Sequence, residues 1–154
     1  MKKSEPSEIA PRGTLIIGYG NALRGDDGAG PCIVEWVEQQ QWPDVTTLSA
    51  HQLFPEMAEQ MAQHERVIFV DADAATVDAV GLQPIVEASD RLMAHRCSPG
   101  SLVRMARELY GARPAAFLYT IPARCFDVCT TFSPLTRNCV RDACNALTQL
   151  LAKS

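Results

Sequence analysis

The sequence of 154 residues contains only three histidines and no long apolar run. No stretch approaches the roughly 20 apolar residues that a membrane-spanning helix needs. Lys2 and Lys3 are not followed by the apolar segment of a secretion signal. The net charge of −4 provides no basic stripe for binding nucleic acid. We therefore expect a cytoplasmic protein with no membrane and no nucleic-acid partner.

The familiar motifs of several hydrolase classes are also missing. The chain has no Gly-x-Ser-x-Gly turn, which would carry a nucleophilic serine, and no His-Glu-x-x-His helix, which would bind zinc. Its aspartates do not lie in the Asp-Thr-Gly-like loops of pepsin-type proteases. If the protein cleaves peptides, it uses a different arrangement of groups.

No Cys-x-x-Cys pair occurs among the six cysteines, which are Cys32, Cys97, Cys125, Cys129, Cys139 and Cys144. Without an export signal, reduced thiols are expected. Three of the cysteines fall on expected helices, where thiols usually pack. The three in expected loops, at 97, 125 and 129, lack zinc-site spacing, so a soft-metal site there is the less favoured alternative.

The pattern of expected elements indicates the fold class. Apolar runs without alternation predict strands buried on both faces at 14–17 and 66–71. Shorter strands are expected at 45–48, 82–86 and 116–121. Helices are expected to begin near Pro31, Pro55, Pro99 and Pro134. This alternation predicts an α/β fold: a single-domain, doubly wound, mostly parallel sheet with helices on both faces. The domain spans residues 13–154, after a flexible tail over 1–12.

The last two helices follow the dipeptides Ser98-Pro99 and Ser133-Pro134. Serine followed by proline is typical of a helix N-cap and the first helical position. Helical spacing predicts that Leu102, Met105, Ala106 and Leu109 face inward on the first of these two helices, and that Val140, Ala143, Leu147, Leu150 and Leu151 do so on the second.

The most informative stretch follows the first expected strand and reads Gly18-Tyr19-Gly20-Asn21-Ala22-Leu23-Arg24-Gly25-Asp26-Asp27-Gly28-Ala29-Gly30. It places two carboxylates at the carboxyl end of a strand, where open parallel sheets bind ligands. A dinucleotide-binding loop would need a third glycine in place of Leu23, and the paired acids would repel a phosphate. Alternatively, one of the acids simply caps the following helix.

A second acid, Asp71, ends a later expected strand. A doubly wound sheet brings Asp27 and Asp71 together across one crevice. Two carboxylates with one imidazole would form a partial site for a divalent transition metal. The alternative interpretations are a helix cap for Asp27 and a solvated strand end for Asp71.

The glycine-rich stretch, with its Asp-Asp-Gly-x-Gly ending, resembles the opening signature of the hydrogenase maturation proteases. These endopeptidases trim the C-terminus of the large subunit of nickel–iron hydrogenases, and the resemblance covers roughly residues 13 to 150. It implies that Asp27 and Asp71 are the metal-contacting and catalytic carboxylates. It also implies that no cofactor is resident, because the substrate precursor supplies the nickel.

The third metal ligand is less clear from the sequence. In the best-known members of the resembled family, a histidine directly follows a Ser-Pro pair that opens a helix, whereas Gly100 occupies that position here. His95, a few residues earlier, is the first choice. His51, at the end of the second expected strand, is the alternative, and His64 fits a solvated helix end.

Other residues near the same edge have supporting roles in this hypothesis. Asp26 is expected to cap the helix or to orient Asp27, and is also a possible alternative ligand. Asn21 is expected to brace the loop through hydrogen bonds from its side chain to the backbone. Asp73 is a secondary candidate.

The sequence therefore predicts an endopeptidase that removes the C-terminal peptide of a nickel–iron hydrogenase large-subunit precursor after nickel insertion. Its partner is that precursor. The sequence does not fix the oligomeric state, and a monomer is expected. Two alternatives remain open: a non-catalytic chaperone of hydrogenase assembly and a nucleotide-binding α/β module.

Overall fold

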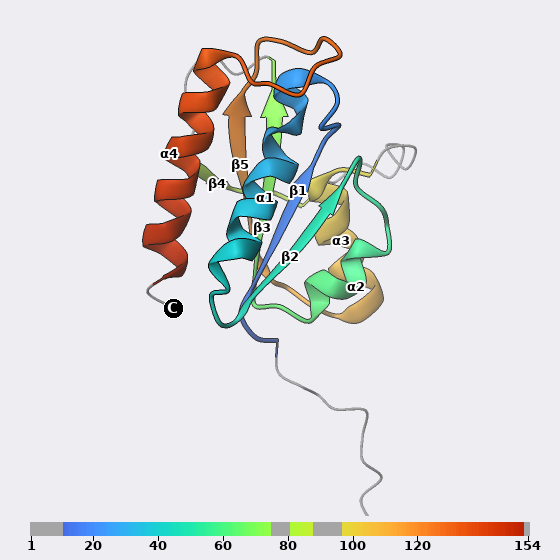
Figure 1. Ribbon diagram of the computed structural model, residues 1–154. Coiled ribbons are helices and arrows are strands. Elements are labelled where there is room, and N and C mark those ends of the chain that lie inside the picture. Colours follow the sequence, from blue (N-terminus) through green and yellow to red (C-terminus); the bar gives the residue numbers. More distant parts are fainter. Residues whose placement is uncertain (1–10, 75–80, 88–96, 153–154) are drawn as a thin grey trace, which may run out of the picture.

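The computed structural model describes residues 11–74, 81–87 and 97–152 (Figure 1). Its elements, in chain order, are β1 (Thr14–Tyr19), the 3-10 turn η1 (Gly25–Gly28), α1 (Ala29–Gln40), β2 (Val45–Ala50), α2 (Met57–Ala62), β3 (Arg66–Asp73), β4 (Leu82–Pro84), α3 (Pro99–Tyr110), β5 (Ala115–Pro122) and α4 (Pro134–Leu151). The expected tail falls mostly on residues 1–10, which lie outside this description.

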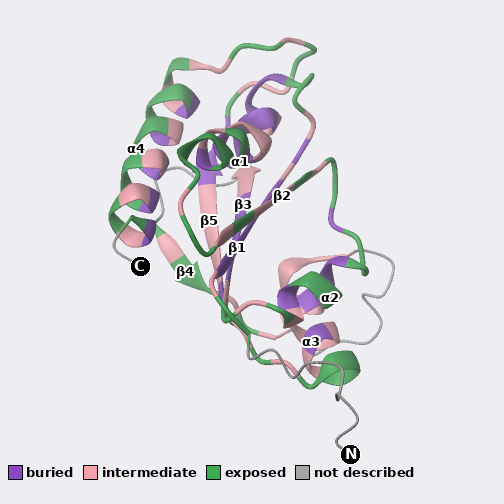
Figure 2. Cartoon of the chain, turned by 60° about the horizontal axis from the view of Figure 1, so that its bottom comes forward, coloured by how far each residue is buried: buried purple, intermediate pink, exposed green. Residues whose placement is uncertain are grey.

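The five strands form one sheet in the order β2-β1-β3-β5-β4. Neighbouring strands from β2 to β5 are parallel, and only β4 pairs in the antiparallel direction. Helices α1 and α4 cover one face of the sheet, and α2 and α3 cover the other (Figures 1 and 2). The predicted doubly wound, mostly parallel α/β fold is confirmed.

The central strands are buried on both faces, as their continuous apolar runs predict. In β1, Ile16 packs with the α1 and α4 side of the core, whereas Leu15 and Ile17 pack with the α2 and α3 side. Residues 67 to 70 of β3 alternate in the same way, and all four are fully buried. Because both faces are covered, the remaining polar groups of the central strands gather at their ends.

Two glycines allow α1 to lie directly against the strands. A Cβ on Gly18 would collide with the Gly30 carbonyl and the Val34 side chain. A Cβ on Gly30 would lie 2.6 Å from the Val70 carbonyl oxygen. This close approach holds the N-terminus of α1 at the carboxyl ends of β1 and β3.

The serine caps form as predicted. The Ser98 hydroxyl accepts a hydrogen bond from the Ser101 amide at 3.1 Å, and the Ser133 hydroxyl accepts one from the Thr136 amide at 3.4 Å. On α4, Ala143, Leu147 and Leu151 are buried in the core.

Strands β1, β2 and β5 extend one or two residues beyond their predicted ranges, and three further details differ from the sequence prediction. Strand β3 continues to Asp73 because it pairs with β5 along that whole length. Strand β4 ends at Pro84 rather than at residue 86. The inward position predicted for Leu109 is wrong: its exposed fraction is 67%, because the buried contacts of α3 end at Ala106.

All six cysteines are free thiols. Among the described residues, no helix has the length and apolarity needed to cross a membrane.

Candidate functional site

The candidate site lies at the carboxyl ends of the parallel strands, at the top of Figure 1. The glycine-rich loop and η1 follow β1 there. Asp71 and Asp73 lie at the carboxyl end of β3, and the loop after β5 crosses above this end of the sheet. In open parallel sheets this is the edge at which ligands bind.

Asp71 is a partly buried acid that shares its surroundings with other acids. Burial raises the pKa of Asp71 to about 6, and the charges of Asp27 and Asp73 act in the same direction. A hydrogen bond from the Tyr19 hydroxyl partly offsets this effect. Asp71 is thus half-buried rather than fully solvated. Because β1 and β3 are parallel, the segment after β1 that carries Asp27 lies at the same sheet edge as Asp71.

The Tyr19 hydroxyl is a donor that sequence reasoning did not assign. Burial raises the pKa of Tyr19 well above its ordinary value, and the neighbouring Asp71 and Asp73 raise it further. Tyr19 therefore remains protonated and keeps donating to the Asp71 carboxylate. Tyr19 and Asp71 directly follow the paired residues Gly18 and Val70 on neighbouring parallel strands. Alternation places both on the α2 and α3 side, so strand pairing was the signal that could have linked them.

Asp27 is held by the loop that precedes it. Its Oδ2 accepts a hydrogen bond from the Asn21 amide at 2.6 Å. The Asn21 side chain accepts one from the Leu23 amide at 2.9 Å, so Asn21 braces the loop as expected. Gly20, with φ +141°, allows the close approach of the Asp27 backbone. The N-cap of α1 is Gly28 with no side-chain cap, so the helix-cap alternative for Asp27 is wrong.

Asp26 does not cap α1 but binds distant parts of the chain. The carboxylate is fully buried, and its Oδ2 accepts hydrogen bonds from the Arg124 amide (2.7 Å), the Cys125 amide (2.9 Å) and the Ser133 hydroxyl (2.7 Å). Its Oδ1 accepts one from the Ser133 amide at 2.7 Å. Burial alone would raise its pKa, but these bonds outweigh it and hold the pKa well below the usual range.

The prediction that Asp26 caps α1 is therefore wrong, and its oxygens are engaged rather than available as metal ligands. The carboxylate ties η1 to the loop after β5 and to the beginning of α4. These partners lie 98 to 107 residues later in the chain, so no local sequence pattern indicates them.

The structure describes two of the three histidines, His51 and His64. His51 is exposed and directly follows β2, whose last carbonyl, that of Ala50, accepts from the Gly20 amide at 3.0 Å. It therefore lies at the same sheet edge as Asp27. Nδ1 of His64 lies 2.7 Å from the Gln60 carbonyl oxygen, at the end of α2 and near the opposite edge. His95 lies outside the described residues.

The third ligand accordingly stays a prediction. Gly100 lies in the first turn of α3 behind the Ser98 cap. Among the described residues, no group of three or more histidine, cysteine or acidic side chains is placed to hold a metal ion. The three loop cysteines do not gather either: Cys97 packs on the α2 and α3 side of the core, whereas Cys129 borders Gly25.

The neighbouring acids act directly on Asp71. The charges of Asp27 and Asp73 both favour its protonated form, and a cation beside Asp71 would favour the ionised form. Carboxylate oxygens with an imidazole from a nearby loop are a common donor set for divalent transition metals.

Comparison with known proteins points to one group. No family model matches the chain, and no curated protein sequence does. Among solved structures, the [NiFe] hydrogenase maturation protease HycI from Thermococcus kodakarensis is similar with a TM-score of 0.72 and 17% identity over 94% of this chain and 95% of that one.

The hydrogenase maturating endopeptidase HybD from E. coli has a TM-score of 0.68 and 20% identity, over 92% of this chain and 93% of that one. The hydrogenase 2 maturation peptidase from a Thaumarchaeota archaeon has a TM-score of 0.65 and 21% identity, over 93% of this chain and all of that one. The chain thus has the fold of the hydrogenase maturation proteases.

Proposed function

We propose that this protein is a cytoplasmic endopeptidase that removes the C-terminal peptide of a nickel–iron hydrogenase large-subunit precursor after nickel insertion. The observation that carries the proposal is the coupling of Asp27 and Asp71 at one edge of a fold shared with maturation proteases. In the resembled family, the metal is contacted by the second acid of the glycine-rich loop and by the acid at the end of a later strand, which correspond to Asp27 and Asp71 here.

The nickel belongs to the substrate in this proposal. Asp27 and Asp71 bind it, and a histidine, His95 or His51, supplies a further donor. The bound nickel polarises the scissile carbonyl or activates a water molecule. The Tyr19 hydroxyl holds the Asp71 carboxylate in place by donating a hydrogen bond to it. The backbone N–H of Asn21 holds the Asp27 carboxylate in the same way.

The raised pKa of Asp71 is compatible with binding the nickel ion of the substrate. With its pKa at about 6, the carboxylate is mostly ionised near neutral pH and carries charge for a dication. A positive ion beside it lowers the pKa and holds the ionised form. The protein therefore presents a weak, open site that is completed when the nickel-loaded precursor docks, and it acts as a monomer.

The test is cleavage of a large-subunit precursor prepared with and without nickel, followed by the mass of its C-terminal peptide. Cleavage is expected only for the nickel-loaded form. Asp27→Asn removes one charge while keeping the side chain's size, and loss of such a ligand typically costs about 10–100-fold in affinity or activity. Asp142→Asn, on the exposed side of α4, is the matched control. Equal cleavage of the nickel-free precursor, or full activity of Asp27→Asn, would contradict the proposal.

One observation favours a second candidate function. Gly100 stands where the best-known proteases of this kind have a histidine, so the site could bind the nickel centre without cleaving the chain. Such an assembly chaperone would bind the nickel-loaded precursor tightly and leave its mass unchanged.

A further inference from the structure

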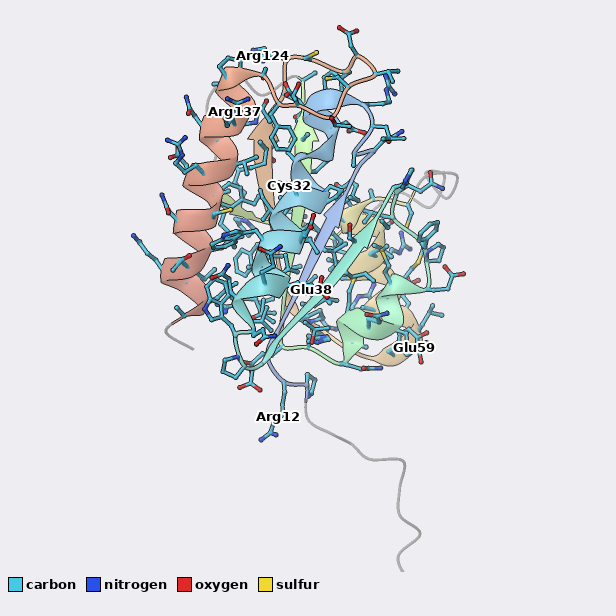
Figure 3. The ribbon with its side chains drawn as sticks, viewed as in Figure 1. Arg12, Cys32, Glu38, Glu59, Arg124 and Arg137 are labelled. Carbon is cyan, nitrogen blue, oxygen red and sulfur yellow. The ribbon has the colours of Figure 1, made fainter. Side chains whose placement is uncertain are left out.

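A groove of about 450 Å³ begins at the glycine-rich loop and runs along α1. One end of it is formed by Ala22, Leu23 and Gly28, and Gly28 directly follows Asp27. Glu38 of α1 lines the groove farther from the loop, and Ser49 of β2 lines it too. Figure 3 labels Cys32 and Glu38, which mark how far the groove extends along the helix.

The groove has two chemical parts. Near the loop its lining is apolar, with Leu23, Pro31 and Phe132, and the Leu23 side chain is 61% exposed. Farther along, Glu35 and Glu38 line it, and both are exposed. Neither acid forms an ion pair with any other residue in the described part of the chain. Like charges one turn apart on a helix repel each other, so a cation between them would be favourable.

The dimensions suit a short extended segment. From Pro31 to Glu38, α1 rises about 10 Å at about 1.5 Å per residue. An extended chain advances about 3.3 Å per residue, so about three residues match that length. The neighbouring strand β2 is at the edge of the sheet, and its outer backbone groups pair with no other described strand. Such groups readily accept an extended peptide.

We propose that this groove binds an extended segment of the precursor protein that carries one apolar and one basic side chain about two residues apart. The apolar side chain lies against Leu23 and Phe132, and the basic one lies between Glu35 and Glu38. The segment then passes over the glycine-rich loop to Asp27. This inference rests on the proposed function and names the feature of the substrate that the protein recognises.

The first test is charge reversal with cleavage of the nickel-loaded precursor as the readout. Glu35→Lys/Glu38→Lys should raise KM about tenfold and leave kcat within about twofold, because the changed groups contact only the bound segment. Raising the ionic strength should raise the wild-type KM and have little effect on the variant. The control Glu65→Lys/Asp142→Lys makes the same change in net charge at exposed positions outside the groove. If the lysines disturb α1, Glu35→Gln/Glu38→Gln should show the same trend with a smaller rise. A KM equal to that of the wild type in both groove variants would overturn the proposal.

The second test does not depend on cleavage. A photoreactive benzophenone amino acid in place of Leu23 should crosslink to the C-terminal region of the precursor, and it should do so equally in the Asp27→Asn background. Crosslinking without cleavage by the wild type would support the groove and refute the endopeptidase. Cleavage with a crosslink only to a second copy of this chain, or to no part of the precursor, would refute the groove and leave the endopeptidase standing.

Discussion

Replacing Asp71 with asparagine should stabilise the fold at neutral pH while abolishing maturation. The carboxylate is partly buried beside Asp27 and Asp73, and this environment raises its pKa from an ordinary 3.8 to about 6. At about 1.4 kcal/mol per pH unit, ionising it in the folded protein costs about 3 kcal/mol. Since Asp71 is only partly buried, we expect asparagine to recover about 1–3 kcal/mol of the free energy of unfolding. The asparagine oxygen can still accept the hydrogen bond from Tyr19.

The pH dependence identifies the cause. Below about pH 4, Asp71 is protonated in both the folded and the unfolded chain, so the variant and the wild type should be equally stable. Between about pH 4 and pH 6, only the unfolded chain has released its proton, so the wild type loses stability as the pH rises. Above about pH 6, Asp71 is ionised in both the folded and the unfolded chain, so the wild type carries the full free-energy cost of ionising it in the fold. The advantage of Asp71→Asn should therefore grow over this interval and then remain constant.

Urea unfolding of both proteins across this pH range measures the difference directly. Asp142→Asn, which removes an exposed charge on α4, should show no such pH-dependent gain. An asparagine variant that is less stable at neutral pH, or whose advantage does not change with pH, would show that the environment of Asp71 is not electrostatically unfavourable. The reasoning on the site would then be wrong.

Further outcomes follow from the same structure. Asp26→Asn should lower the free energy of unfolding by at least about 2 kcal/mol, measured by urea unfolding, because an amide leaves buried donors facing its NH₂ group; unchanged stability would contradict its role in tying the loops together. Gly18→Ala should cost about 1–3 kcal/mol through displacement of α1, visible as a lower Tm. His95→Ala should impair maturation of the precursor more than His64→Ala does, and wild-type processing by both His95→Ala and His51→Ala would show that the carboxylates act without an imidazole.

Much of the fold was predictable because a strand covered on both faces has a distinctive sequence. The apolar runs beginning at Thr14 and Val67 have no alternation, and both became central strands of a parallel sheet. All strands that run parallel end at the same edge, and only β4 runs the other way. The placement of Asp27 and Asp71 at one edge therefore follows from topology without any knowledge of side-chain contacts.

What the sequence did not indicate are the contacts between distant segments. The partners of Asp26 lie about a hundred residues later, and only the closed fold brings them together. Leu109 continues the helical spacing of α3, yet periodicity does not show where the covering core ends. The hydrogen bond from Tyr19 to Asp71 depends on which face of each strand the two side chains share.

The two adjacent aspartates of the glycine-rich loop, Asp26 and Asp27, have different roles. Asp26 is fully buried but receives four hydrogen bonds, so its ionised form stabilises the fold and is lost only in strong acid. Asp27 receives a hydrogen bond from the Asn21 amide and contributes its charge to Asp71. The first acid fixes the loop to the rest of the fold so that the second is held near Asp71 in spite of their repulsion. This arrangement keeps negative charge beside Asp71 in spite of its cost, which is the property that the proposed binding of a metal-loaded substrate requires.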